Sequence, residues 1–274
     1  MKRILTLMLA LAMIFSLAAC SSVASKPSGS DTDTSWTDIV AKGSFTLGFD
    51  QTFAPMGFKD GSGEYVGFDI DLATEVAKRL DLELKLQPVD WDSKAIELDA
   101  GNIDLIWNGL SITDDNKKDM LFSDPYMNNR QIILVMASSG ITSIADLAGK
   151  TVAAQVESSA MSAINAQPEV KATFGSLIES PDYVEALMEL KQGSVDAVVI
   201  DEIFGRYYIS KEADPSAYAV LEENFGEEQY GIGFRLGDTA FRDKVQETLE
   251  AMIADGTAAE ISDKWFGENI VIGG

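Results

Sequence analysis

Short apolar runs alternate with amphipathic stretches along the chain from Trp36 onward. The run over 45–49 predicts a strand, and apolar residues that recur every three or four positions over 72–80 predict a helix. Such alternation is typical of α/β proteins. The same pattern predicts a hairpin turn at 61–63, strands at 84–86, 104–107, 131–136, 151–154, 197–200 and 230–234, and helices at 94–100, 144–147, 182–191, 239–254 and 258–266.

Two eight-residue segments resemble each other: ELDAGNID at 97–104 and ELKQGSVD at 189–196. Each runs from the end of a predicted helix, through a glycine suited to ending it, into an apolar strand. One such unit per domain predicts two similar lobes. The alternative is chance recurrence of a common helix–glycine–strand pattern. Polar residues follow both strands, Asn108 in the first unit and Asp201 in the second. Ligands bind at the carboxyl ends of strands in open α/β sheets, so a site is predicted there.

The first residues have the pattern of a processing signal. Lys2 and Arg3 precede an apolar stretch that ends before Cys20 and is short for a membrane span, so 1–19 is predicted to be a signal peptide. Leu17-Ala18-Ala19-Cys20 resembles the lipobox of bacterial lipoproteins, whose cysteine is lipidated; the alternative is a free cysteine after an ordinary signal peptide. Residues 20–35 contain little to bury and predict a flexible tether. The protein is then expected outside the cytoplasm, lipid-anchored to the bacterial cell membrane.

The composition excludes several kinds of chemistry. The 274 residues include no histidine and one cysteine, which rules out histidine-based triads, histidine-ligated zinc and a disulfide framework. No metal or cofactor is expected. With 44 acidic and 21 basic side chains, the formal charge of −23 argues against nucleic acid and favours a cationic or zwitterionic partner. The length predicts two domains.

Eight segments resemble the polar amino-acid-binding proteins of ATP-binding-cassette (ABC) importers, the solute-binding family 3 type. The resemblance runs from about residue 45 to 266 and implies a two-lobed, type II periplasmic-binding-protein-like fold. Each lobe is then a β-sheet flanked by helices. The segments are GFDQTFAPM at 48–56, VGFDIDL at 66–72, GNID at 101–104, SITD at 111–114, FSDPY at 122–126, DAVVID at 196–201, YGIGF at 230–234 and KWFG at 264–267.

A return of the C-terminal segment to the first lobe predicts two crossings that together form a hinge. They are expected near 128–130 and 227–229. Lobe 1 would comprise 36–127 and 229–274, and lobe 2 would comprise 128–228.

The resemblance also implies where lobe 1 contacts a ligand. Asp50 and Phe53 stand where such proteins supply a polar contact and an aromatic wall. Trp91 would form the opposite wall. Without the resemblance, a tryptophan at this position is expected to be a packing residue. The ligand's α-amino and carboxylate groups are expected to meet Asn108, Gly109 and Ser111.

In lobe 2, Gln155, Ser158 and Ser159 are expected to line the site, where the start of a helix offers backbone N–H groups to a carboxylate. Asp201 would hold the α-ammonium group. Like Asp50, it follows an apolar strand, where the alternative role of a carboxylate is to cap a helix or turn.

Two positions depart from the family pattern. Asn116 stands where these proteins normally place an arginine that clamps the ligand carboxylate in a bidentate fashion. Lys117, Lys118 or Arg130 are candidates to replace it. Glu157 stands where glycine is usual, either as a solvated acid near the next helix or as a third negative group in the cleft. Because the arginine is missing, a neutral or cationic ligand is expected.

The predicted function is therefore that of a monomeric amino-acid receptor, with no chemistry of its own, that delivers its ligand to the transmembrane permease subunits of an ABC importer. Ligand binding would stabilise the closed state of the hinge. One alternative is an enzyme on the same scaffold, resembling the cyclohexadienyl dehydratases, with Glu157 or Asp201 as general acid. Another is a sensor subunit that reports ligand to a separate membrane partner.

Overall fold

The computed structural model describes residues 33–273. The predicted signal peptide, Cys20 and most of the predicted tether lie outside the described residues. Helix α2 (Ser35–Lys42) begins at the last residue of that tether, and the Oγ of Ser35 accepts a hydrogen bond from the N–H of Phe241. Within 33–273, no helix combines the length and apolar character needed to cross a membrane.

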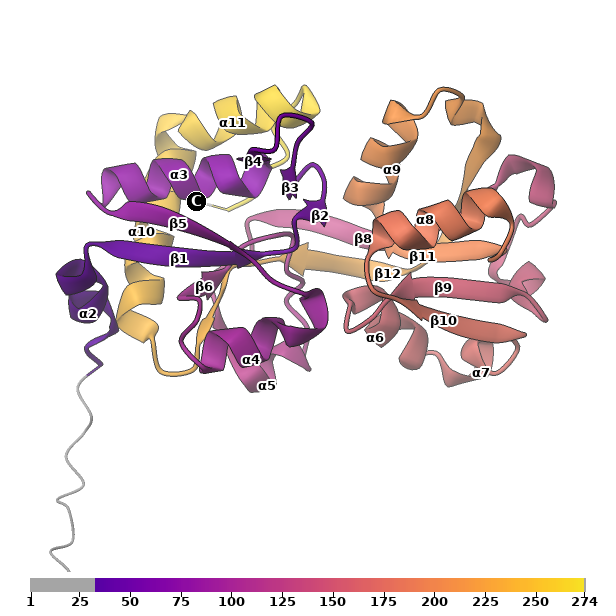
Figure 1. Ribbon diagram of the computed structural model, residues 1–274, viewed down its shortest axis with the longest axis horizontal. Helices are drawn as coiled ribbons and strands as arrows, with labels where there is room; N and C mark the ends of the chain where they lie inside the picture. The colour runs from indigo at the N-terminus through magenta and orange to yellow at the C-terminus, as the bar shows by residue number, and fades with distance from the viewer. Residues whose placement is uncertain (1–32, 274) are drawn as a thin grey trace, which may run out of the picture. The chain divides into compact units, whose positions relative to one another are not determined.

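The first five-stranded sheet has the order β5-β1-β6-β13-β7. Strands β5 and β6 pair in parallel with β1, and β13 pairs antiparallel with β6 and β7. Helices α3 and α11 lie over one face of this sheet, and α4 lies over the other (Figure 1). The bounds are β1 Ser44–Phe49, α3 Phe68–Arg79, β5 Glu83–Pro88, α4 Lys94–Asp99, β6 Leu105–Ile106, α5 Asn116–Asp119, β7 Met120–Phe122, β13 Gly233–Arg235, α10 Thr239–Asp255 and α11 Thr257–Phe266.

The second sheet repeats this plan in the order β10-β9-β11-β8-β12. Strands β10 and β11 pair in parallel with β9, and β8 pairs antiparallel with β11 and β12. Helices α8 and α9 lie on one side of it, and α6 and α7 lie on the other (Figure 1). The bounds are β8 Met127–Met136, β9 Thr151–Gln155, α6 Ser159–Asn165, α7 Pro168–Lys171, β10 Ser176–Ser180, α8 Tyr183–Gln192, β11 Ala197–Asp201, α9 Glu202–Lys211 and β12 Tyr218–Tyr230.

Parallel strands covered on both faces need apolar residues on both faces, which explains the continuous runs in the sequence. Phe45, Leu47 and Phe49 of β1 and all five residues of β11 are buried. The predicted hairpin is a three-stranded sheet of β2 (Thr52–Phe53), β3 (Gly57–Lys59) and β4 (Tyr65–Val66). The predicted helix at 144–147 is a single 3-10 turn. The helix expected to start beside Ser158 and Ser159 is α6, whereas helices α2, α5, α7 and α9 were not predicted.

The sequence repeat is a structural repeat, because equivalent atoms make equivalent hydrogen bonds in both units. Gly101 and Gly193 both adopt the left-handed conformation, with φ of 76° and 77°. The Asp104 carboxylate accepts a hydrogen bond from the N–H of Thr46 at 2.7 Å, and that of Asp196 accepts one from the N–H of Thr151 at 2.9 Å. Each aspartate thus ties the strand that follows it to the neighbouring parallel strand, β6 to β1 and β11 to β9.

The two predicted crossings pair with each other as neighbouring strands. Glu228 of β12 lies opposite Asn129 of β8 in an antiparallel register. The fold class is confirmed by these two sheets with their flanking helices and by the solved structures described below. The lobe boundaries themselves remain a prediction.

The prediction of one continuous strand over 230–234 is wrong. Strand β12 ends at Tyr230, and β13 begins at Gly233. Strand β12 pairs with β8 of the second sheet, and β13 pairs with β6 and β7 of the first. The chain therefore passes from the second sheet to the first between Tyr230 and Gly233. The N–H of Gly231 bonds the carbonyl of Leu110 at this break.

Candidate functional site

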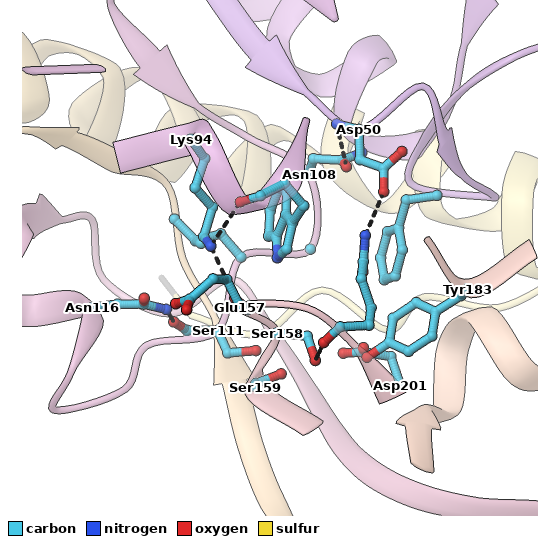
Figure 2. Close-up of a pocket in the computed structure, with 15 residues that line it drawn as sticks. Asp50, Lys94, Asn108, Ser111, Asn116, Glu157, Ser158, Ser159, Tyr183 and Asp201 are labelled. Carbon is cyan, nitrogen blue, oxygen red and sulfur yellow. Dashed lines mark hydrogen bonds between the residues drawn. The ribbon is translucent and has the colours of Figure 1, made fainter. Parts of the chain in front are cut away.

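A small cavity lies where the carboxyl ends of equivalent strands of the two sheets meet. All eleven residues predicted to bind a ligand line it, and Figure 2 shows most of them around one space. The eleven are Asp50, Phe53, Trp91, Asn108, Gly109, Ser111, Asn116, Gln155, Ser158, Ser159 and Asp201.

Asp201 ends β11 and points its carboxylate into a buried network instead of capping the helix that follows. Its Oδ1 accepts hydrogen bonds from Asn129 at 2.7 Å, Gln131 at 3.0 Å and the Tyr230 hydroxyl at 2.5 Å. No side-chain capping bond to α9 is present. Burial, reinforced by the nearby Glu228 carboxylate, raises the pKa of Asp201 to about 8.

Glu228 shares its donors with Asp201. The amides of Asn129 and Gln131 each donate to Glu228 Oε1 as well, at 2.6 and 2.8 Å. Two carboxylates therefore lie beside one end of the cavity. Two like charges at this spacing favour proton retention or a cation between them.

Asp50, just after β1, combines the two roles that the sequence left open. Its Oδ1 accepts hydrogen bonds from the N–H and hydroxyl of Thr52, as a turn cap does. Its Oδ2 accepts a hydrogen bond from Gln155 Nε2 at 2.9 Å. Gln155 ends β9, so this bond joins the two sheets directly. Burial raises the pKa of Asp50.

Asn108 and Gly109 follow β6 and are used mainly to shape the loop. Asn108 Oδ1 accepts a hydrogen bond from the N–H of Asp50 at 3.1 Å, and the N–H of Gly109 donates to Asp69 Oδ2 at 2.7 Å. These bonds use the Asn108 side-chain oxygen and the Gly109 N–H, whereas the Ser111 hydroxyl makes no hydrogen bond within residues 33–273.

Asn116 lines the cavity, although its side-chain amide is engaged by the loop. Its Nδ2 donates to the carbonyl of Ser111 at 2.9 Å. None of the three basic residues considered as substitutes for an arginine here lines the cavity. Lys117 and Lys118 pair with Asp114 and Asp115, and Arg130 makes a bidentate pair with Glu202.

Lys94, the first residue of α4, is the basic residue that does line the cavity. Its Nζ lies 4.8 Å from the centre of the Trp91 ring and donates to the carbonyls of Trp91, at 3.0 Å, and Glu157, at 2.9 Å. Trp91 is thus half-buried with a cation over its ring. Sequence reasoning missed Lys94, although its place three residues after Trp91 puts both on one helical face.

Glu157 adopts a left-handed backbone conformation, with φ of 53°. That conformation favours glycine, which explains why glycine is usual at this position. The residue is exposed and lines the cavity beside Lys94. Next to it, Ser158 caps α6: its Oγ accepts a hydrogen bond from the N–H of Met161. The Ser159 hydroxyl accepts a hydrogen bond from Gln131 Nε2 and donates one to Glu228 Oε1.

An aromatic cluster closes the side of the cavity near Phe53. The Phe53 ring stacks on Phe204 at 5.3 Å and lies 6.0 Å from Tyr183. Tyr183 lines the cavity and was not predicted. The offset of 92 positions between the two repeat units relates it to Trp91, which is the signal that would have found it.

A cavity lined mainly by polar residues, between two sheets of the same plan, defines a two-lobed binding protein. The chain belongs to the bacterial extracellular solute-binding proteins, family 3, which it matches over residues 45–268. It is 31% identical to the L-cystine-binding protein TcyA of Bacillus subtilis (strain 168) over 98% of this chain and 99% of that one.

Solved structures of amino-acid-binding proteins are similar to this chain over most of its length. An ABC uptake transporter substrate-binding protein from Streptococcus pneumoniae with bound histidine is 39% identical, with a TM-score of 0.85 over 88% of this chain and 99% of that chain. The structure of Tv2483 bound to L-arginine is 28% identical, with a TM-score of 0.83 over 88% and 97%. The chain is therefore an extracytoplasmic amino-acid-binding protein of an ABC transporter.

Proposed function

We propose that the chain closes the described cavity around a single α-amino acid, neutral or cationic, and hands it to the permease without altering it. The observation that carries this is the acid pair of Asp201 and Glu228 beside an enclosed cavity. A carboxylate already surrounded by three donors on one oxygen keeps its other oxygen for a cationic group, and an α-ammonium group is such a partner.

The balance of charge around the cavity supports the ligand class. Asp50, Glu157 and Asp201 line it, against one basic residue, Lys94. An amino acid with a negatively charged side chain would add a further anion to this set. The bound histidine and L-arginine in the two solved relatives are in keeping with a neutral or cationic ligand.

We further propose that the folded part works as a monomer at the outer surface of the cell membrane, held by lipid on Cys20 and a short tether. The pattern of residues 1–20 supports this. Two or more acyl chains on one residue are enough for stable anchoring. Metabolic labelling with a fatty acid, compared between the chain and its Cys20→Ser variant, tests the anchor.

A thermal-shift screen against the twenty amino acids and L-cystine tests the function. We expect a neutral or cationic amino acid to raise Tm, because a ligand at a hundred times its Kd adds about 2.7 kcal/mol to the free energy of unfolding. Absence of any shift at millimolar concentration would refute the proposal.

Asp201→Asn then tests the site. A hydrogen bond to a charged group contributes about 1.5–3 kcal/mol, so affinity should fall about 10- to 150-fold by calorimetry. Asp263→Asn, at an exposed position of α11, is the matched control and should leave affinity unchanged.

One observation keeps an enzyme as a second candidate. With a pKa of about 8, Asp201 holds its proton at neutral pH, as a general acid must. Incubation with prephenate or arogenate, followed by absorbance, separates the two: turnover lost in Asp201→Asn would establish a dehydratase, and no turnover with a clear amino-acid shift would establish the receptor.

A further inference from the structure

Lys94 is the one basic side chain that is buried within the described residues, at 5% exposure. It begins α4, directly after the 3-10 turn η1 (Trp91–Ser93). Buried lysines are rare because removing an ammonium group from water is costly unless a counter-charge accompanies it. The surroundings of Lys94 should therefore contain a paired acid, yet the acids nearest to it, Glu157, Asp92 and Asp119, form no ion pair with it.

The protein supplies Lys94 with dipoles and a ring but no direct ion pair. Its Nζ bonds two backbone carbonyls and faces the Trp91 ring. It takes part in none of the ion pairs found at up to 4.0 Å between residues 33 and 273. An ammonium group has three N–H donors, so one is left. Burial lowers the pKa of Lys94 to about 8, with only partial compensation from Glu157, Asp92 and Asp119.

A purely structural role does not account for the charge. Joining α4 to the carbonyl of Glu157 requires one donor, and a neutral amide would provide it at a smaller desolvation cost. The Trp91 ring compensates part of the positive charge, and an anion that enters the cavity lined by Lys94 would supply the ion pair that the described residues do not.

The position of Lys94 indicates which part of an amino acid it meets. Its bond to the carbonyl of Glu157 places Nζ beside the turn that leads into Ser158 and Ser159. Lys94 and Asp201 lie well apart across the view in Figure 2, with cavity-lining side chains between them. Lys94 and Asp201 thus stand at separate places along the cavity wall, as counter-ions for the two ends of a zwitterion must.

We propose that Lys94 is the counter-ion of the ligand's α-carboxylate, which binds between its Nζ and the Ser158–Ser159 turn. The proposal rests on the proposed amino-acid-binding function. It assigns the recognition of the carboxylate to α4, because Asn116 carries no charge and its amide is bonded to Ser111.

The test compares Lys94→Met with the unsubstituted protein on two probes, L-histidine and L-histidinamide, which differ only in the carboxylate. If the screen gives another amino acid the largest shift, that amino acid and its α-amide replace them. We expect the unsubstituted protein to prefer the acid over the amide by tenfold or more. In Lys94→Met, the acid should bind 10- to 100-fold more weakly while binding of the amide is unchanged or tighter. Lys117→Met, an exposed lysine of α5, is the control and should keep the full preference.

Equal losses for acid and amide would overturn the proposal, because they would show that Lys94 only joins α4 to Glu157. Adding Asn116→Arg to Lys94→Met provides a second test. Recovery of the preference for the acid in this double variant supports a carboxylate bound at this place. A double variant that prefers the acid no more than Lys94→Met does contradicts the proposal. Failure of the proposed function shows differently, since the unsubstituted protein would then bind no amino acid.

Discussion

Asp201 shows how a single residue acquires its role from its surroundings. By sequence it precedes a helix and is a natural capping residue, yet its carboxylate is turned toward Asn129, Gln131 and Tyr230. Burial beside Glu228 then makes ionisation unfavourable until a cation arrives. Ligand binding and loss of a proton are therefore linked at this residue.

The linkage predicts that affinity rises with pH between 6 and 7.5. The pKa of Asp201 is raised to about 8, so the empty site is mostly protonated in this range, and the α-ammonium group prefers the ionised form. One proton is released on binding, and affinity should change by up to about tenfold per pH unit. Lys94, with a pKa of about 8, stays charged here and limits affinity only above pH 8.

Calorimetry at pH 6.5 in two buffers of different ionisation enthalpy measures the released proton directly. Asp201→Asn should release none, whatever its remaining affinity. An affinity that does not vary between pH 6 and 7.5 in the unsubstituted protein would show that Asp201 is already ionised in the empty site.

At the scale of elements, the first turn of α3 supports the floor of the cavity. Asp69 of α3 is fully buried, and its carboxylate accepts hydrogen bonds from the Tyr126 hydroxyl and from the N–H of Gly109. Burial raises the pKa of Asp69 to about 7. These bonds hold the loop after β6, where Gly109 has a φ of 58° and lies against the rings of Phe53 and Tyr230.

Gly109→Ala should therefore lower both stability and affinity. The left-handed conformation costs a non-glycine residue about 1–2 kcal/mol. The added Cβ would lie 2.6 Å from Phe53 Cε1, which forces the aromatic wall to move. Urea denaturation and calorimetry measure the two effects.

Gly140→Ala is the matched control. Gly140 has a φ of 74°, and an added Cβ there meets nothing within 4 Å. It should lower stability by the conformational cost alone, about 1–2 kcal/mol, and leave affinity unchanged. Equal affinity losses in the two variants would mean that the loop after β6 does not shape the site.

At the scale of the molecule, a few polar and aromatic contacts hold the two sheets together around the cavity. Gln155 donates to Asp50, Lys94 donates to the carbonyl of Glu157, and Phe53 stacks on Phe204. The two strands β8 and β12 provide the covalent connection. These contacts can be exchanged for water when the sheets separate, so a ligand that binds between the sheets would stabilise the closed state.

Gln155→Met should shift the empty protein toward an open state. It removes the donor of Asp50 Oδ2 and leaves that buried oxygen unpaired, and hydrogen bonds to charged groups contribute about 1.5–3 kcal/mol. Affinity should fall about tenfold or more. Small-angle scattering should show a larger radius of gyration without ligand, and the usual value at saturation.

Gln192→Met, at an exposed position at the end of α8, should change neither quantity. An unaltered radius of gyration in ligand-free Gln155→Met would mean that the Asp50–Gln155 bond does not control closure.

Local patterns were sufficient to predict much of the fold. Apolar runs located β1, β9 and β11 to within a residue or two, because a strand buried on both faces must be apolar throughout. The repeat located two equivalent helix–strand units. The same approach failed for the break at Gly231. The strand ends there because the residues before and after Gly231 pair with strands of different sheets, which a local pattern does not reveal.

The sequence by itself determined the fold class, the family and the eleven residues that line one cavity. The information is local: a strand, its carboxyl end and the polar residue that follows are consecutive in the chain. Only the tertiary structure decided how those residues are used, because burial and hydrogen-bond partners come from segments far apart in sequence. It placed Lys94 rather than Lys117, Lys118 or Arg130 at the cavity, and it joined Asp201 to Glu228, a pair whose shared donors no spacing along the chain reveals.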